Sequence, residues 1–357
     1  RERERERERG APPYSQVLVH KTLLPLFYRK LDDRNDDSLP SALSSHVIKE
    51  AQQHLSTLLD IPKQERFLIL MIGNGALVDM VHSWMCNTKH MRGVHRRTLI
   101  LMTDKAGFND LVKNEHRVHV VDGSLNDTTL ETGVSFGTEA YWRITERRVR
   151  ILGVLLRAGI SFLNIEPDAV WAKNPLLDSR LTSSPHDFVI STEFTADIEL
   201  MFCFGFLLVR SNERTQALFS ELEEQSSASI ANMRNRHHGP EEYVFAKELQ
   251  EQEVLKRLVQ SNAHNVTYSC LDECSYASGR WYIKKDLRKY CKDTAGIPHV
   301  LNNNWITGNT AKMDRAKQWG HWFLDEDKGC KQHAHLEKVN VLFQTFQRLE
   351  PPARGSQ

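Results

Sequence analysis

Two acidic side chains, Glu166 and Asp168, stand one residue apart directly after a short apolar run, residues 160–165. The run predicts a buried strand, and open α/β sheets bind ligands at the carboxyl ends of their strands. Carboxylates are hard oxygen ligands for Mg²⁺ or Mn²⁺, and these cations in turn hold phosphates. The pair therefore indicates a site for a metal ion and a phosphate. The alternative is a surface turn with two solvated acids.

Other residues with similar chemistry stand at the ends of predicted elements. The turn Gly73-Asn74-Gly75, between a predicted strand and a helix, would let a ligand approach the backbone closely. It is neither a dinucleotide fingerprint nor a P-loop, and taken alone it favours a plain tight turn over a nucleotide site. Asp104 lies just past the end of the next strand. Glu241 and Glu242 follow a proline in the first turn of a predicted helix, where acids also stabilise the helix start.

The elements that must position these residues alternate between strands and helices. Apolar runs predict strands over residues 67–72, 97–102, 118–121, 160–165, 188–191 and 201–209. Helical periodicity predicts helices over residues 76–85, 106–114, 136–156 and 212–227. Gly159 stands where the third of these helices would be capped. The alternation predicts an α/β fold with a mostly parallel central sheet and helices on both faces.

Composition excludes some classes of partner. The chain has 357 residues with 47 basic and 46 acidic side chains, so its net charge of +1 provides no field that would attract nucleic acid. No apolar run reaches the roughly 18 residues that a membrane span requires. The sequence does not begin with Met, so we expect membrane attachment only through a preceding anchor, as in a type II membrane protein.

Cysteines and glycosylation sequons indicate an oxidising compartment. Cys86 and Cys203 stand in apolar segments and are expected to be free thiols. The four in the polar last third are Cys270, Cys274, Cys291 and Cys330. Disulfides are favoured over zinc there, because only the first two of the four have the spacing of a zinc-ligand pair. With the sequons at Asn126 and Asn265, this pattern predicts a disulfide-bonded glycoprotein of the secretory-pathway lumen. Within that pathway we expect the Golgi apparatus.

The flanks of the alternating region differ from it in composition. Residues 1–15 open with alternating Arg and Glu and predict a disordered charged tether. Residues 16–62 form a helical stem or lead-in, residues 63–330 the catalytic domain, and residues 331–357 a last helix and tail. No other chemistry is expected from the flanks.

Four motifs occur in an order that is specific in combination. They are LLRAGISFLNIEPDAVWAKNPL at residues 155–176, CFGFLLVRS at 203–211, EEYVF at 241–245 and NNNWITGNTAK at 302–312. This order resembles the nucleotide-diphospho-sugar transferase family, glycosyltransferases of GT-A fold best known from plant cell-wall enzymes. The resemblance spans about residues 65–322 and implies a GT-A-like, Rossmann-related sheet.

The resemblance implies a reaction as well as a fold. A member of this family would move a hexose or pentose from a nucleotide diphosphate sugar, with UDP the expected nucleotide, to a hydroxyl of a glycan or glycoprotein. Similarity to retaining enzymes implies that the acceptor approaches the face from which the diphosphate leaves. A divalent cation, Mn²⁺ or Mg²⁺, would neutralise charge on the leaving group.

The family pattern also assigns roles to particular residues. Asp168, Glu166 and Asn302 stand at the metal-binding positions, with Glu166 as an alternative ribose contact. Glu241 or Glu242 would steady positive charge at the anomeric carbon.

Further residues are expected around the nucleotide. Lys312, one turn into the helix after Gly308, and Arg148 are candidate partners of the diphosphate. Trp305 would stack or pack beside the site. The nucleoside would lie against Gly73 and Asn74, with Asp104 at the same sheet edge.

This sequence departs from the family pattern at four points. Glu166 replaces an Asp, Cys203 an Asn, Asn302 a His, and Glu241-Glu242 an Asp-Gln pair. A second class of function therefore stays open, namely a degenerate member that binds a nucleotide or sugar without turnover. A dinucleotide-dependent oxidoreductase is disfavoured, because its glycine fingerprint is missing.

Overall fold

The structure is a computed structural model, and it describes residues 41–114, 117–124, 138–194, 200–234 and 250–331. All of these belong to one compact unit, residues 39–357. The expected charged tether, the first part of the lead-in up to residue 40 and the last helix beyond residue 331 lie outside the described residues. So do Glu241, Glu242 and the sequon at Asn126.

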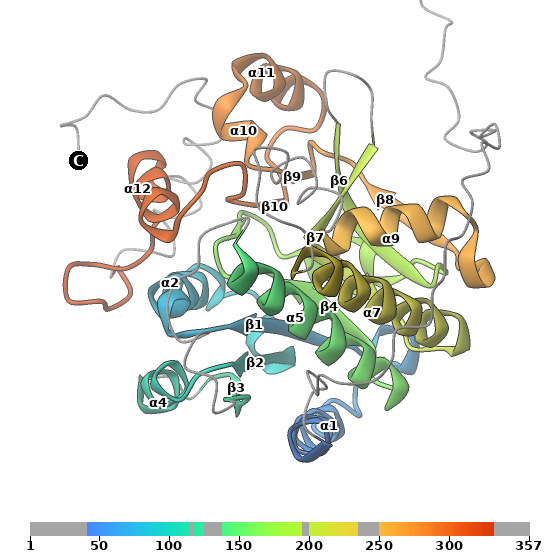
Figure 1. Ribbon diagram of the computed structural model, residues 1–357. Helices are drawn as coiled ribbons and strands as arrows, with labels where there is room; N and C mark the ends of the chain where they lie inside the picture. The colour runs from blue at the N-terminus through green and yellow to red at the C-terminus, as the bar shows by residue number, and fades with distance from the viewer. Residues whose placement is uncertain (1–40, 115–116, 125–137, 195–199, 235–249, 332–357) are drawn as a thin grey trace, which may run out of the picture. The chain divides into compact units, whose positions relative to one another are not determined.

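A seven-stranded sheet of order β3-β2-β1-β4-β7-β6-β8 forms the centre of the described part of the chain (Figure 1). Its strands are β1 (Leu68–Gly73), β2 (Thr98–Met102), β3 (His119–Asp122), β4 (Phe162–Ile165), β6 (Phe188–Phe194), β7 (Leu200–Val209) and β8 (Tyr268–Leu271). Among these seven, β7 runs antiparallel to its neighbours β4 and β6, and the other pairs are parallel. The prediction of a mostly parallel α/β sheet is therefore confirmed.

Apolar side chains alternate between the two faces of this sheet, which explains why both faces are covered. In β1, Leu68 and Leu70 belong to the core on one face, whereas Ile69 and Met71 belong to the core on the other. Successive strand residues point to opposite faces, so a strand that is apolar throughout requires a layer on each side.

Helices supply those two layers. The first core is covered by α1 (Ser41–Ser56), α5 (Glu139–Arg157), α7 (Glu213–Arg234) and α9 (Glu251–Gln260). The second core is covered by α2 (Val78–Thr88), α3 (Val94–Arg97) and α4 (Lys105–Asn114), and the short α6 (Ser179–Thr182) adds Leu181 to it. Figure 1 shows α5 and α7 side by side across the sheet. The layers fix the sheet as a rigid platform whose strand ends can carry a site.

A small three-stranded sheet lies at the carboxyl end of β4. It consists of β5 (Val170–Trp171), β10 (Val300–Leu301) and β9 (Tyr276–Ala277). Because Leu301 pairs with Val170, the segment after β10 is held beside the turn after β4. Three more helices follow in this region, namely α10 (Arg280–Ile283), α11 (Lys285–Thr294) and α12 (Asn309–Trp319), and α6 (Ser179–Thr182) precedes β6.

Two disulfides, Cys86–Cys330 and Cys274–Cys291, tie this region together. The expectation that Cys86 is a free thiol is wrong, because its apolar surroundings contain a partner 244 residues away in the sequence. Cys203 is free and buried as expected, and Cys270 is free and exposed. Disulfides therefore account for three of the four cysteines in the last third, and one of these, Cys330, is bonded to Cys86 of α2.

None of the helices that the structure describes is long and apolar enough to cross a membrane.

Candidate active site

A cleft of about 530 Å³ opens at the edge of the sheet where β4 ends. Because β7 is antiparallel to β4, the first half of β7 lies at this same edge, and the Glu166 N–H donates to the Gly205 carbonyl at 3.2 Å. The cleft is walled by side chains of α5, β6, β7, the start of α9 and residues 304–312. Segments far apart in the sequence therefore meet at the predicted sheet edge.

Glu166 lies on the wall of this cleft and is paired with Arg148 of α5. Arg148 Nη1 lies 3.1 Å from Glu166 Oε1, and its Nη2 donates to the Glu251 carboxylate at the start of α9. Burial opposes the charge of Glu166, but Arg148 and Lys312 outweigh it, so the pKa of the Glu166 carboxyl lies below its usual value. Arg148 thus stays protonated between two carboxylates, at a position that faces the cleft.

Asp168 is buried beside the cleft and is paired with Lys312 of α12. Lys312 Nζ lies 2.6 Å from Asp168 Oδ2. Burial raises the pKa of the Asp168 carboxyl, and Lys312 offsets only part of this effect. Lys312 lines the cleft, whereas Asp168 lines a small neighbouring cavity that Lys312 also reaches. The two carboxylates after β4 therefore face adjoining spaces, with Lys312 between those spaces.

Asn302 follows β10 and meets Glu166 above Gly205. Asn302 Nδ2 donates to the Cys203 thiol at 3.2 Å. A Cβ added to Gly205 would lie 2.5 Å from Asn302 Nδ2 and 2.7 Å from Glu166 Oε2. Only glycine leaves room for both side chains here, so Gly205 is part of the site through the absence of a side chain.

The predicted metal ligands are chemically suited to a divalent cation. Asp168 Oδ1 and Asn302 Oδ1 are buried oxygens without a hydrogen-bond partner among the described residues, and Glu166 lies close by. Buried acceptors are rarely left unsatisfied, and hard oxygen donors are the ligands that Mg²⁺ and Mn²⁺ prefer. No group of three His, Cys, Asp or Glu side chains that could together hold a metal ion occurs in the described ranges. A cation here would rely on two carboxylates and one amide oxygen.

Glu193 is a cleft residue that the sequence analysis missed. It lies in β6, and its carboxylate accepts from Asn304 Nδ2 at 2.7 Å and from Trp305 Nε1 at 2.5 Å. Burial raises the pKa of Glu193. The apolar run ended the predicted strand at Ser191, whereas β6 continues to Phe194. Ser191, Thr192 and Glu193 are consecutive polar residues, so the hydrophobic pattern contained no signal that the strand continues.

Trp305 and Gly308, two of the predicted nucleotide-site residues, also line the cleft. Trp305 has a left-handed φ of 59°, and Arg280 stacks on its ring with 5.7 Å between the guanidinium carbon and the ring centre. Gly308 has a φ of 91° and precedes α12, so it allows the chain to turn into the helix that carries Lys312.

Three predicted nucleotide contacts lie at the same sheet edge but outside the cleft wall that the described residues form. They are Gly73, Asn74 and Asp104. The Asp104 carboxylate accepts the Gly75 N–H, and it accepts the Gly107 N–H at 2.8 Å. The Gly73 carbonyl accepts the Thr103 N–H at 2.8 Å. Asp104 is thereby engaged in joining the turn after β1 to the start of α4.

The fold and this cleft define an α/β protein with a cleft lined by charged side chains at the carboxyl edge of its sheet. A sequence model of the family described as nucleotide-diphospho-sugar transferase matches residues 93–316, which is more than half of the chain. The chain belongs to this family of glycosyltransferases.

Individual relatives are distant. The chain is 22% identical over 211 residues to UDP-D-xylose:L-fucose alpha-1,3-D-xylosyltransferase 1 of Arabidopsis thaliana, covering 55% of this chain and 54% of that protein. It is 22% identical over 278 residues to beta-arabinofuranosyltransferase RAY1 of the same plant, covering 74% and 49%. It is 21% identical to UDP-galactose:fucoside alpha-3-galactosyltransferase of Dictyostelium discoideum, covering 58% and 32%. The chain thus spans about half the length, or less, of these relatives.

Two glycosyltransferases are among the solved structures to which this chain is similar. Glycosyltransferase GlyE of Streptococcus pneumoniae has a TM-score of 0.44 at 11% identity, covering 82% of this chain and 66% of that chain. Galactosyltransferase LgtC, solved with donor and acceptor sugar analogues, has a TM-score of 0.41 at 13% identity, covering 78% and 95%.

Proposed function

We propose that this protein transfers a sugar from a nucleotide diphosphate sugar, with UDP as the nucleotide, to a hydroxyl of a glycan or glycoprotein. The observation that supports this reading is the cleft at the end of β4, where Arg148 and Lys312 stand beside Glu166 and Gly308. Carboxylates outnumber the two cations around this cleft, so a diphosphate would bind there together with a divalent cation that supplies the missing positive charge. The family to which the chain belongs supports the same reading.

The chemistry requires charge to be neutralised at two places. As the glycosidic bond to the diphosphate breaks, negative charge grows on the leaving oxygens and positive charge grows at the anomeric carbon. Lys312 and Arg148 would hold the diphosphate. Glu241 or Glu242, which lie outside the described residues, would stabilise the positive charge at the anomeric carbon. We propose retention of configuration, so that the acceptor hydroxyl enters from the face that the diphosphate leaves.

A divalent cation, Mn²⁺ or Mg²⁺, fits this proposal. It would be held by the carboxylates of Asp168 and Glu166 and by the amide oxygen of Asn302. Asp168 Oδ1 and Asn302 Oδ1 have no hydrogen-bond partner among the described residues, so both are available as ligands. When bound, such a cation acts as a Lewis acid toward the diphosphate.

The test is release of UDP from candidate donors. UDP-xylose and UDP-galactose are the first donors to assay, and fucosides the first acceptors, because the names of similar proteins contain these sugars. We expect turnover with Mn²⁺ and its loss with EDTA. Lys312→Met should lose most of this activity, whereas Lys317→Met, an exposed position on the same helix, should retain it. Equal turnover in both variants would contradict the assignment of Lys312.

A second function is favoured by one observation at the metal site. Asn302 stands where the family has a metal-binding His, and its amide already donates to Cys203. A protein that has lost the cation would bind a nucleotide or sugar without transferring it. Binding of UDP in calorimetry, without release from any donor in the presence of Mn²⁺, would identify this function.

We further propose that the protein works in the lumen of the secretory pathway, in the Golgi apparatus. Two disulfides support this location, because such bonds persist in oxidising compartments.

A further inference from the structure

Lys312 and Asp168 form an ion pair that the proposed function requires to open. Lys312 Nζ lies 2.6 Å from Asp168 Oδ2, with 24% of the lysine side chain and 4% of the aspartate side chain exposed. Lys312 lines both the cleft and the small cavity in which Asp168 lies. The ammonium group is therefore bound to the carboxylate on one side and adjoins the ligand space on the other.

Each partner in this ion pair has a second task in the proposed reaction. A diphosphate in the cleft would draw the positive charge and the N–H donors of Lys312 toward itself. A divalent cation would require the carboxylate of Asp168 as a ligand. Two positive charges on one buried carboxylate repel each other strongly, because the low local dielectric screens them little. Lys312 and the cation therefore compete for Asp168.

The surroundings of Asp168 favour replacement of the ammonium by a cation of higher charge. Asp168 Oδ1 and Asn302 Oδ1 are buried without hydrogen-bond partners among the described residues. Among the described residues, the ion-pair partner of the Asp168 carboxylate is the single ammonium group of Lys312. Arg148 differs from Lys312 in this respect, since it is held by two carboxylates, Glu166 and Glu251.

We propose that Lys312 is a removable counter-ion of Asp168, which a divalent cation replaces on the carboxylate while Lys312 transfers to the diphosphate. The inference rests on the proposed function, in which both ligands occupy this site. Opening the ion pair is then a shared cost for the two ligands, and whichever binds second finds the ion pair already open. Cation and nucleotide must therefore strengthen each other's binding, and by the same factor in both directions.

The alternative is a permanent structural ion pair in which Lys312 stays on Asp168 when ligands bind. The two arrangements predict opposite effects of removing the ammonium. If Lys312 competes with the cation, its removal strengthens cation binding in the absence of nucleotide. If Lys312 only holds Asp168 in place, its removal leaves cation binding unchanged or weakens it.

The experiment is a titration with Mn²⁺ alone, with free Mn²⁺ measured by electron paramagnetic resonance, followed by calorimetry with UDP at saturating Mn²⁺. We expect Lys312→Met to bind Mn²⁺ about tenfold more tightly than the wild type, and UDP about tenfold more weakly. Lys312→Gln, which keeps an N–H donor for Asp168 without the charge, should shift in the same directions. Lys317→Met should match the wild type in both titrations.

The outcomes separate this inference from the proposed function. Unchanged or weaker Mn²⁺ binding in both Lys312 variants, with cooperative thermal unfolding retained, overturns the counter-ion proposal alone. A wild-type protein that binds no UDP at any Mn²⁺ concentration overturns the proposed function, and this inference with it. Opposite shifts for Mn²⁺ and UDP in the variants support the inference, because a structural role would move both affinities the same way.

Discussion

The indole of Trp305 donates its N–H to the buried carboxylate of Glu193, with 2.5 Å between Nε1 and Oε2. The neighbouring Asn304 amide donates to the other carboxylate oxygen at 2.7 Å. Trp305 adopts a φ of 59°, a conformation that is rare for a bulky residue and is retained where surrounding contacts fix it. Because Glu193 and Trp305 both line the cleft, the hydrogen bond between them fixes one wall of the proposed ligand site.

Replacing Trp305 by Phe should reveal this bond. The ring remains, but one oxygen of a buried carboxylate loses its indole donor, which destabilises the protein by about 1–3 kcal/mol. In a Glu193→Gln background the same replacement should cost less stability, because a buried amide oxygen without a donor is less unfavourable than a buried carboxylate oxygen without one. Urea unfolding of the four proteins measures this coupling in a double-mutant cycle. Strictly additive effects would show that the two side chains act independently.

Gly205→Ala should remove ligand binding without unfolding the protein. The new Cβ would lie 2.5 Å from Asn302 Nδ2 and 2.7 Å from Glu166 Oε2, so both side chains must move. We expect Mn²⁺-dependent UDP affinity to fall by about tenfold or more, since a small displacement of ligating groups has large effects.

Gly159→Ala is the matched comparison for Gly205→Ala. Gly159 has a φ of 80° and no atom within 4 Å of an added Cβ, so the change strains the backbone without a collision. It should lower stability by about 1 kcal/mol and leave UDP affinity intact. If both variants lost affinity equally, the loss at Gly205 would not be specific to the site.

The sheet was predictable because its strands are apolar on both faces. In β2, Leu99 and Leu101 face one core while Ile100 and Met102 face the other. An uninterrupted apolar run of this kind is typical of a buried parallel strand, so the local sequence is enough to predict it. The placement of Glu166 at the cleft was predictable on the same basis, because it follows the last residue of β4 directly.

Contacts between distant segments were not predictable from local pattern. Cys86 pairs with Cys330 only because the fold brings α2 and the segment after α12 together. Glu193 was missed because a register shift between Ile190 and Ser191 lets β6 continue beyond its apolar residues. The type and position of Asp104 could not distinguish a nucleotide ligand from the acceptor of two backbone N–H groups that the structure describes.

Stability should decrease in acid through Asp187, which joins the starts of β6, α7 and β8. Its carboxylate accepts from Asn212 at 2.7 Å, from Arg214 at 2.6 Å and from the Thr267 N–H at 2.8 Å. Burial opposes its charge, but these donors prevail and lower the pKa of Asp187 to about 2. A carboxyl whose folded pKa is depressed stabilises the protein above its unfolded pKa, and this stabilisation disappears as the pH falls through the folded value.

The measurement is the thermal unfolding midpoint of the wild type and Asp187→Asn as a function of pH. Between pH about 4 and about 2 the free energy of unfolding of the wild type should fall by about 1–2 kcal/mol, a contribution that Asp187→Asn lacks at every pH. This figure allows for solvent screening, because the side chain of Arg214 is half exposed. The two curves should therefore converge toward pH 2. Parallel curves across this range would show that Asp187 does not carry the acid sensitivity.

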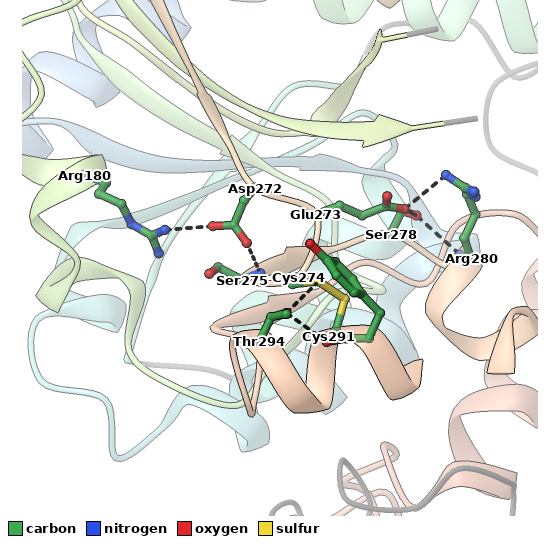
Figure 2. Close-up of a disulfide and its surroundings, with 10 residues drawn as sticks. Arg180, Asp272, Glu273, Cys274, Ser275, Ser278, Arg280, Cys291 and Thr294 are labelled. Atoms are coloured by element: carbon green, nitrogen blue, oxygen red, sulfur yellow. Dashed lines mark hydrogen bonds and ion pairs between the residues drawn. A yellow bond between two sulfur atoms is a disulfide. The ribbon is translucent and has the colours of Figure 1, made fainter. Parts of the chain in front are cut away.

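The two disulfides should differ in what their removal affects. Figure 2 shows the bond between Cys274 and Cys291 beside Glu273, which pairs with Arg280 at 3.3 Å. Arg280 in turn stacks on Trp305, so this disulfide supports the wall of the cleft. Replacing Cys274 and Cys291 by Ser should weaken UDP binding, because Arg280 is no longer held over the indole.

Replacing Cys86 and Cys330 by Ser should act mainly on stability. The Cys86–Cys330 bond spans 244 residues and the Cys274–Cys291 bond 17, so loss of loop-closure entropy predicts stabilisation of about 5 and about 3 kcal/mol respectively. Urea unfolding and UDP calorimetry on both double variants give the comparison. We expect the first pair to lose more stability and the second to lose more affinity. The same ranking in both measurements would contradict a specific role for Cys274–Cys291, because affinity would then follow stability alone.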